Sequence, residues 1–289
     1  MKLQIAGLYM DIQCDGSVEA HLPNLQPFVT EIFPEGESIV CTLLTGQTIE
    51  EEDTEPTLTS VSDEKTIRLW LKPDACKLSL YIRSLGHTCW LQADREWRNV
   101  STDWKPQSSQ FYPYLDDFIM ITFVYSSAFH QTATIHASSV AINHQGCAFI
   151  GPSGIGKSTH SRLWLEHVPG THLLNDDQPI LRFQPDGTVR IYGSPWSGKT
   201  ECFRNEGAEL KALFFMQQSL ENEITRLTPI ETFQRLMKAT SIIGRDTVTF
   251  KGISHTLASV SGGVPAYLFK NQPTREAVGM SYQAFSNCL

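Results

Sequence analysis

The sequence lacks paired cysteines, long hydrophobic runs and an excess of positive charge. Its seven cysteines are isolated along 289 residues with no C-x-x-C pair, which disfavours a zinc site or a disulfide framework. No apolar run reaches the roughly 18 residues of a membrane span, and the N-terminus has no signal-peptide pattern. The net charge of −8 disfavours nonspecific binding to nucleic acid or to an acidic membrane. We therefore expect a reduced, cytoplasmic protein with no nucleic-acid or membrane partner.

The chain is long enough for two domains with sizeable cores. Residues 1–110 are rich in runs typical of strands, and the runs 66–71 and 76–82 alternate apolar and polar side chains. The polar, turn-forming segment "KPQSSQ" at 105–110 is the expected domain boundary. Residues 111–289 mix helical and strand patterns. The predicted fold class is therefore α+β or α/β, with a β-rich N-terminal domain.

Two segments match the phosphate-binding pattern G-x-x-x-x-G-K-[ST]. They are "GPSGIGKS" at 151–158 and "GSPWSGKT" at 193–200. Average residue frequencies give one match by chance in roughly one protein in a hundred of this length. Two matches leave three alternatives: two nucleotide sites, one site and one chance match, or one site built from both loops.

The first match has the sequence context that phosphate binding requires. A strand pattern precedes it and a helix pattern follows it, so that backbone N–H groups and the helix dipole can hold phosphates. In the second match, Pro195 removes an N–H donor, Trp196 is bulky, and Gly207 limits any helix that follows. We therefore predict one ATP-binding loop, formed by Gly151, Ser153, Gly154, Ile155, Gly156, Lys157, Ser158 and Thr159.

Two adjacent carboxylates follow the first loop. In such loops the lysine, here Lys157, reaches the β- and γ-phosphates, and the hydroxyl of Ser158 binds Mg²⁺. "HLLNDD" places Asp176 and Asp177 about 20 residues after the lysine, at the end of a short strand pattern. One carboxylate would hold the metal and the other would accept a proton from an attacking hydroxyl. The alternative is a turn or cap formed with Asn175.

A histidine precedes the first loop. His136, in "TIHASS", lies on the strand pattern that leads to it. A single histidine in a strand is either a hydrogen-bonded core residue or, this close to a phosphate loop, part of the active site. The sequence leaves both interpretations open.

The order "IHAS", strand, "GPSGIGKS", helix, strand, "DD" resembles the catalytic domain of the HPr kinase/phosphorylase family. That fold is shared with phosphoenolpyruvate carboxykinases. The resemblance covers roughly residues 130–200 well. It implies a C-terminal P-loop kinase domain in which Asp176 is the general base for a serine hydroxyl. It also implies that Ser158 and Asp177 bind Mg²⁺ and that His136 lies near the phosphates.

The second loop resembles a segment of HPr kinase-like proteins that are not themselves HPr kinases. We hypothesise a single nucleotide site in which Ser197, Gly198 and Lys199 line the same pocket, with Lys199 binding the transferred phosphate or the substrate. The alternative is a surface turn with a solvated lysine. Thr159 stands where HPr kinases usually have Glu, and residues 1–110 do not resemble their N-terminal domain. Both departures argue against HPr itself as the substrate.

The sequence therefore predicts an ATP- and Mg²⁺-dependent kinase. The acceptor is a hydroxyl, with serine expected, of a peptide, protein or small molecule. Residues 1–110 would recognise the substrate or a partner, through a peptide strand added to an open sheet edge. The related kinases assemble as hexamers, so this chain could form a homo-oligomer. One alternative is an ATP-binding regulatory protein with little turnover, and another is a carboxykinase, for which the chain is short.

Overall fold

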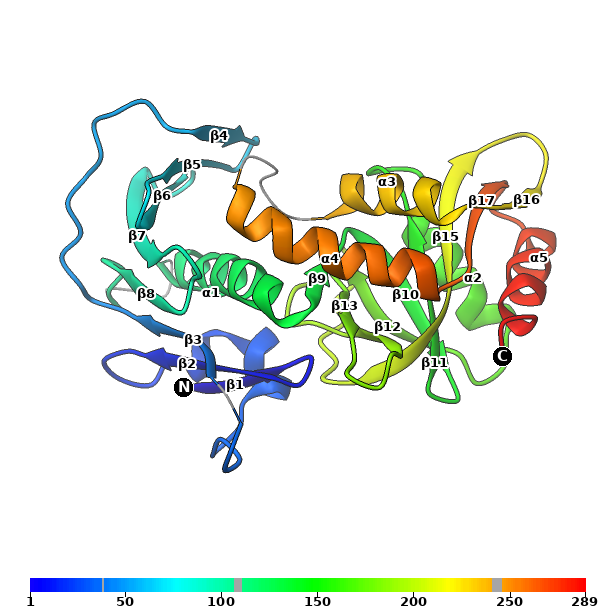
Figure 1. The fold of residues 1–289 in the computed structure, drawn as a ribbon, viewed down its shortest axis with the longest axis horizontal. Helices are drawn as coiled ribbons and strands as arrows, with labels where there is room; N and C mark the ends of the chain where they lie inside the picture. Colours follow the sequence, from blue (N-terminus) through cyan, green and yellow to red (C-terminus); the bar gives the residue numbers. More distant parts are fainter. Residues whose placement is uncertain (38, 107–110, 241–245) are drawn as a thin grey trace. The chain divides into compact units, whose positions relative to one another are not determined.

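The computed structural model describes residues 1–37, 39–106, 111–240 and 246–289. The protein is of mixed α/β class, with two large sheets and a few helices (Figure 1). No helix in these described ranges is long and apolar enough to cross a membrane. Contacts divide the chain into a first unit, Met1–His130 with Ile242–Lys251, and a second unit, Gln131–Ser241 with Gly252–Leu289.

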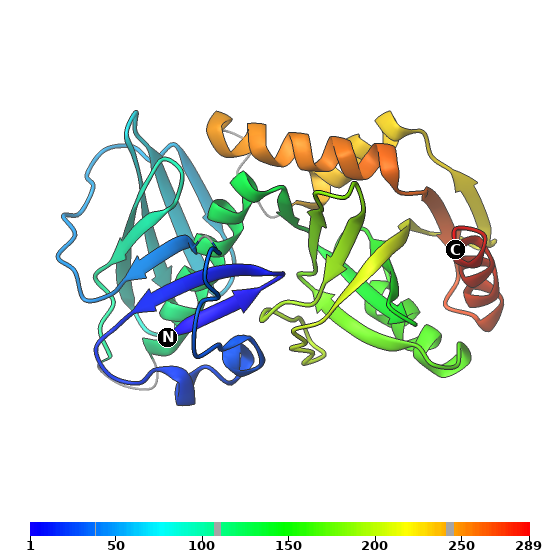
Figure 2. The ribbon, with the colours of Figure 1, turned by 60° about the horizontal axis from the view of Figure 1, so that its bottom comes forward.

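The first unit contains an eight-stranded sheet of order β1-β2-β3-β8-β7-β6-β5-β4. The strand pattern over residues 2–13 forms a hairpin of two strands, blue in Figure 2. The turn lies at Ala6 and Gly7, which adopt positive φ angles of 51° and 73°. The strands are β1 (Lys2–Ile5), β2 (Leu8–Gln13), β3 (Ile39–Leu44), β4 (Leu58–Val61), β5 (Lys65–Leu71), β6 (Ala75–Ile82), β7 (His87–Asp94) and β8 (Asn99–Thr102); short 3₁₀ turns span Glu19–His21, Pro23–Phe28 and Ala128–His130.

Helix α1 (Tyr112–Ser127) packs against β3 of this first sheet. The helix is apolar around most of its circumference and so needs cover on several sides. Tyr125 stacks on Trp97 with ring centroids 4.5 Å apart, and Lys65 forms an ion pair of 2.6 Å with Asp117. These contacts place α1 in the core of the first unit.

The domain boundary expected at 105–110 differs from the division that the structure makes. Residues 107–110 lie outside the described part of the chain. The contacts divide the chain after His130 instead. The helix that follows the polar segment therefore belongs to the first unit, because its apolar surface is buried against the first sheet rather than the second.

The second unit is built on a nine-stranded sheet. Its main path runs β12-β10-β11-β15-β14-β13-β9, and β17 pairs with both β15 and β16. The strands are β9 (Thr132–Thr134), β10 (Ala137–Ile142), β11 (Gln145–Ile150), β12 (His172–Asp177), β13 (Ile180–Phe183), β14 (Val189–Tyr192), β15 (Gly207–Gln218), β16 (Glu223–Arg226) and β17 (Ala266–Asn271).

Helices α2 and α3 lie on different faces of the sheet. Their contacts show this, because they involve neighbouring residues of β15, whose side chains point to opposite sides. Phe149 and Phe214 pack in one core with Trp164 of α2, whereas the ring of Phe215 lies beneath Arg235 of α3. The helices are α2 (Lys157–His167), α3 (Pro229–Ala239), α5 (Arg275–Ser286), and α4 (Thr247–Gly263), whose residues group with the first unit as far as Lys251 and with the second from Gly252.

Candidate active site

The loop of residues 151–156 joins the end of β11 to the start of α2, as the sequence predicted. Gly154 and Gly156 have φ angles of 79° and 107°, a conformation that side chains disfavour. A Cβ atom at either position would meet nothing within 4 Å, so the backbone conformation, rather than lack of space, requires glycine. The unpaired N–H groups of the first turn of α2 and the helix dipole make this loop suited to an anion.

Lys157 is the first residue of α2 and folds back over the loop. Its Nζ lies 2.9 Å from the carbonyl oxygen of Gly151, 3.2 Å from that of Pro152 and 2.9 Å from His136 Nε2. Burial lowers the pKa of Lys157, and the carboxylates of the adjacent aspartates oppose that shift. The lysine is therefore held at the loop by two carbonyls and an imidazole.

His136 lies between β9 and β10, where the predicted continuous strand is interrupted. Its backbone N–H donates to the carbonyl of Ala239 over 2.7 Å. Its ring joins Lys157, through Nε2, to Asp177, whose Oδ1 lies 2.8 Å from Nδ1. Burial raises the pKa of Asp177, but hydrogen bonding and charge from His136 outweigh it and leave that pKa below its usual range. His136 is thus within the site rather than in the core.

The two aspartates both line one cavity, although neighbours on a strand normally point to opposite faces. Asp176 is 4% exposed and pairs with Ser138 of β10. Asp177 ends β12 with a φ of 134°, which interrupts the extended conformation. Such strained backbone costs about 1–3 kcal/mol and persists only where its surroundings impose it. Strand β12 includes both aspartates and ends at Asp177, and the Asn175 side chain caps that end by accepting the N–H of Gln178.

The second loop runs beside the end of β12. The N–H of Gly198 donates to the carbonyl of Asp176 over 2.5 Å, and the hydroxyl of Ser197 donates to the same oxygen over 3.1 Å. Ser197 also forms an isolated bridge with Asp177. No helix follows, and β15 begins at Gly207. The loop extends the sheet edge and does not form the strand–loop–helix geometry of the first loop.

Asn175, which the sequence suggested only as a turn residue, fastens this second loop. Its side chain is fully buried. Nδ2 lies 3.2 Å from the hydroxyl of Ser194 and 3.0 Å and 3.4 Å from the carbonyls of Trp196 and Cys202. Oδ1 accepts from the N–H of Gln178 over 2.8 Å. The sequence suggested the local contact with Gln178, but nothing there indicated the partners of Nδ2 in the second loop.

The two loops and β12 enclose a cavity of about 440 Å³. Among the predicted residues, Gly151 lines a neighbouring cavity, Ile155 packs on the core, and Ser197 braces the second loop. Lys199 is exposed and lines this cavity together with the later residues of the first loop. The residues that line this cavity are His136, Ser153, Gly154, Gly156, Lys157, Ser158, Thr159, Asp176, Asp177, Gly198 and Lys199.

The oxygen ligands in this cavity fit Mg²⁺. The hydroxyl of Ser158 and the carboxylate of Asp177 are hard donors, and Mg²⁺ typically takes one or two carboxylates and completes its shell with phosphates and water. Over the described ranges, no group of three or more His, Cys, Asp and Glu side chains is placed to hold a metal ion. The site therefore suits a metal that arrives with a phosphate ligand better than a metal held by protein alone.

Comparisons with known proteins give a limited result. No family model matches the sequence, and no curated protein sequence matches it. Among solved structures, the HPr(Ser) kinase/phosphatase from Coxiella burnetii is similar over 53% of this chain and 88% of that chain, with 15% sequence identity and a TM-score of 0.33. With a TM-score and an identity this low, the activity has to be inferred from the chain's own residues.

Proposed function

We propose that the protein is an ATP- and Mg²⁺-dependent phosphotransferase that transfers the γ-phosphate to a hydroxyl of a peptide, protein or small molecule. The observation that carries this proposal is the convergence of two lysines and two aspartates on one cavity at the start of α2. The loop and helix terminus suit the phosphates, and Lys157 and Lys199 supply positive charge to the same cavity. A carboxylate in the same cavity supplies the base that a simple nucleotide binder does not need.

In the proposed reaction the acceptor oxygen forms a bond to the γ-phosphorus while the bond from that phosphorus to the β,γ-bridging oxygen breaks. Asp176 takes the proton of the acceptor hydroxyl, and ADP leaves. Mg²⁺, when bound with ATP, would neutralise charge on the β- and γ-phosphates. Ser158 and Asp177 would hold it there. His136 positions the Asp177 carboxylate and the Lys157 ammonium relative to each other.

Lys199 would contact the phosphate during transfer, because the second loop brings it to the same cavity as Lys157. Gly198 lets the second loop pack closely against the end of β12. A Cβ atom there would lie 3.2 Å from both the Asp176 carbonyl and the Asp177 Cβ. The second loop then belongs to the same site as the first and is not an independent nucleotide site.

The test is label transfer from γ-labelled ATP with Mg²⁺ to free serine, serine-containing peptides and HPr, with release of labelled phosphate to water measured in parallel. Asp176→Asn is expected to abolish transfer and leave ATP affinity within about twofold of wild type. Asp186→Asn, in the exposed turn between β13 and β14, is the matched control and should transfer normally. Tight ATP binding with no label transfer to any acceptor would favour the regulatory alternative, and a loss of binding in Asp176→Asn would contradict its role as a base.

A further inference from the structure

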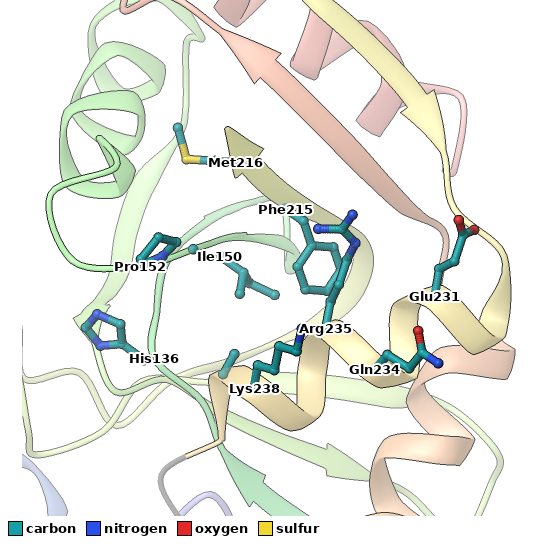
Figure 3. Close-up of a pocket in the computed structure, with 11 residues that line it drawn as sticks. His136, Ile150, Pro152, Phe215, Met216, Glu231, Gln234, Arg235 and Lys238 are labelled. Carbon is teal, nitrogen blue, oxygen red and sulfur yellow. The ribbon is translucent and has the colours of Figure 1, made fainter. Parts of the chain in front are cut away.

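A second cavity, of about 590 Å³, adjoins the phosphate cavity within the same unit. It lies between α3 and the ends of β11 and β15 (Figure 3). Ligand cavities of this size hold small molecules or a few residues of a peptide. The lining residues are His136, Ile150, Gly151, Pro152, Phe215, Met216, Glu231, Gln234, Arg235, Lys238 and Ala239.

The first loop divides between the two cavities. Gly151 and Pro152, at its beginning, line the α3 cavity, whereas its later residues line the phosphate cavity. Lys157 Nζ is bonded to the carbonyls of both of these residues and to His136, which lines both cavities. Because that lysine reaches the β- and γ-phosphates in loops of this type, the α3 cavity lies at the γ-phosphate end of a bound nucleotide. An acceptor must approach from that end.

Helix α3 presents polar side chains to this cavity at positions i, i+3, i+4 and i+7, from Glu231 to Lys238, which is one face of a helix. Arg235 and Lys238 are exposed, and neither forms an ion pair with another residue of the described ranges. The Glu231 carboxylate is already bonded to the N–H and the hydroxyl of Thr228, where it closes the capping box of α3. With two cations and one carboxylate, the face carries a net positive charge toward the cavity.

The rest of the lining is apolar. Ile150, Phe215 and Met216 are 2%, 4% and 6% exposed, and the guanidinium of Arg235 lies 5.9 Å from the centroid of the Phe215 ring. Figure 3 shows Arg235 beside that ring, on the side of α3 that faces Ile150. Stacking on an aromatic ring restricts an arginine while its N–H groups remain available for a bidentate partner. Carboxylates and phosphates both fit this geometry, and because the first loop already binds the nucleotide phosphates in the proposed function, a carboxylate is the partner we assign to Arg235.

We propose that the α3 cavity binds the phosphate acceptor and that this acceptor is a hydroxyl compound carrying a carboxylate. The proposal rests on the phosphotransferase function above. Arg235 and Lys238 bind the carboxylate, and the apolar lining covers the carbon chain. The hydroxyl points past His136 to the γ-phosphate, where Asp176 takes its proton. The carboxylate itself is unchanged in the reaction. A free hydroxy acid and an acidic peptide share this chemistry.

The test is equilibrium binding by calorimetry to the full chain saturated with a non-hydrolysable ATP analogue and Mg²⁺. The probes are matched acid and amide pairs: malate with malamide for a free hydroxy acid, and acetyl-Ser-Glu-amide with acetyl-Ser-Gln-amide for a peptide. The acid of at least one pair is expected to bind at least tenfold more tightly than its amide. The pair that shows the preference identifies the source.

The double variant Arg235→Gln/Lys238→Gln is expected to lose this preference, and Arg235→Lys should retain part of it because the charge remains. The control is Lys251→Gln/Arg275→Gln, which removes two exposed charges that line neither cavity. Equal binding of acid and amide to the wild type in both pairs would overturn the proposal, as would a preference that survives in the double variant.

Nucleotide binding separates this proposal from the proposed function. The double variant should bind the ATP analogue like the wild type, because its two residues do not line the phosphate cavity. Weakened nucleotide binding would assign the α3 cavity to the nucleotide and overturn the acceptor assignment. A wild type that binds the acid but transfers no phosphate would leave this site in place and contradict the phosphotransferase function alone.

Discussion

The segments at 151–158 and 193–200 match the same eight-residue pattern but adopt different structures. The first contains left-handed glycines and leads into a helix. In the second, Gly193 is required for a different reason, since a Cβ atom there would lie 2.2 Å from the carbonyl oxygen of Arg204. The pattern therefore specifies residue types and not backbone geometry. What the segments share is a lysine that reaches the same cavity.

The two loops are also held by different forces. The first is anchored by α2, whose Trp164 packs on Phe149 and Phe285 in the core. The second is held by backbone pairing to Asp176 and by the side chain of Asn175. A loop anchored by a helix resists displacement through apolar burial, whereas the second loop depends on a few hydrogen bonds from its backbone and from Asn175. The predictions below separate the two loops on this basis.

The largest difference is expected between the two lysines. Lys157→Met should lower phosphate transfer by about 10³-fold and weaken ATP binding, because a buried cation directed at the phosphates is lost. Transfer and nucleotide affinity are measured on the same preparation. A variant that keeps full transfer would show that the first loop is not the phosphate site.

Lys199→Met is expected to lower transfer by about 10²-fold while changing ATP affinity by less than about threefold. The reason is that this lysine would contact the phosphate during transfer rather than in the bound nucleotide. Lys251→Met, at an exposed position of α4, serves as the control. Normal transfer in Lys199→Met would identify the second loop as a surface turn with a solvated lysine.

The sequence predicts the strands, loops and helices around the two loops better than it predicts how these elements pack together. The strand, loop and helix around residues 147–168 follow from local signals, and Pro195 and Trp196 correctly indicate that the second match has no helix. The α3 face from Glu231 to Lys238 could be recognised by its helical spacing. The cavity that this face lines depends on β11 and β15, which are distant in the sequence.

The function of Asn175 could not be predicted for the same reason. Local preference favoured a turn, which accounts for the bond from Gln178 to its Oδ1, but the partners of its Nδ2 lie 19 to 27 residues further along the chain. The placement of α1 likewise depends on the first sheet, because an apolar helix following a polar linker can pack on either neighbour. Local patterns fix the elements, and long-range packing decides which loops share a site.

Asn175→Ala tests how the second loop is held. Removing the amide leaves buried carbonyls without their donor, which costs about 1–3 kcal/mol, and should reduce transfer by about tenfold with ATP affinity unchanged. Trypsin should then cleave more rapidly after Lys199 and Arg204. Asn175→Asp, which keeps the size but turns a carboxylate toward the same carbonyls, should be more damaging than the alanine variant, because it buries an unpaired charge. Slow cleavage together with normal transfer would show that the backbone pairing alone holds the loop.

The smallest effect concerns the anchor of the first loop. His160 of α2 packs between Phe149 and Phe269, with ring centroids 4.7 Å and 5.0 Å away, and Nε2 lies 3.0 Å from the hydroxyl of Ser281. Burial lowers its pKa to about 4 from an ordinary value of 6.5. Between these values the unfolded chain binds a proton that the folded chain does not, so stability falls as the pH falls.

From pH 7 to pH 5.5 this histidine should remove roughly 1 kcal/mol of stability, which urea unfolding measures. His160→Gln should be less stable at pH 7 but should lack this component of the pH dependence. Between pH 7 and pH 5.5, hydrogen exchange corrected for the intrinsic rate should accelerate more in α2 than in the second loop, because only the first loop is anchored through this ring. Equal losses of stability in wild type and variant would mean that His160 titrates in the folded protein as it does in water, and that the anchor of α2 is not sensitive to acid.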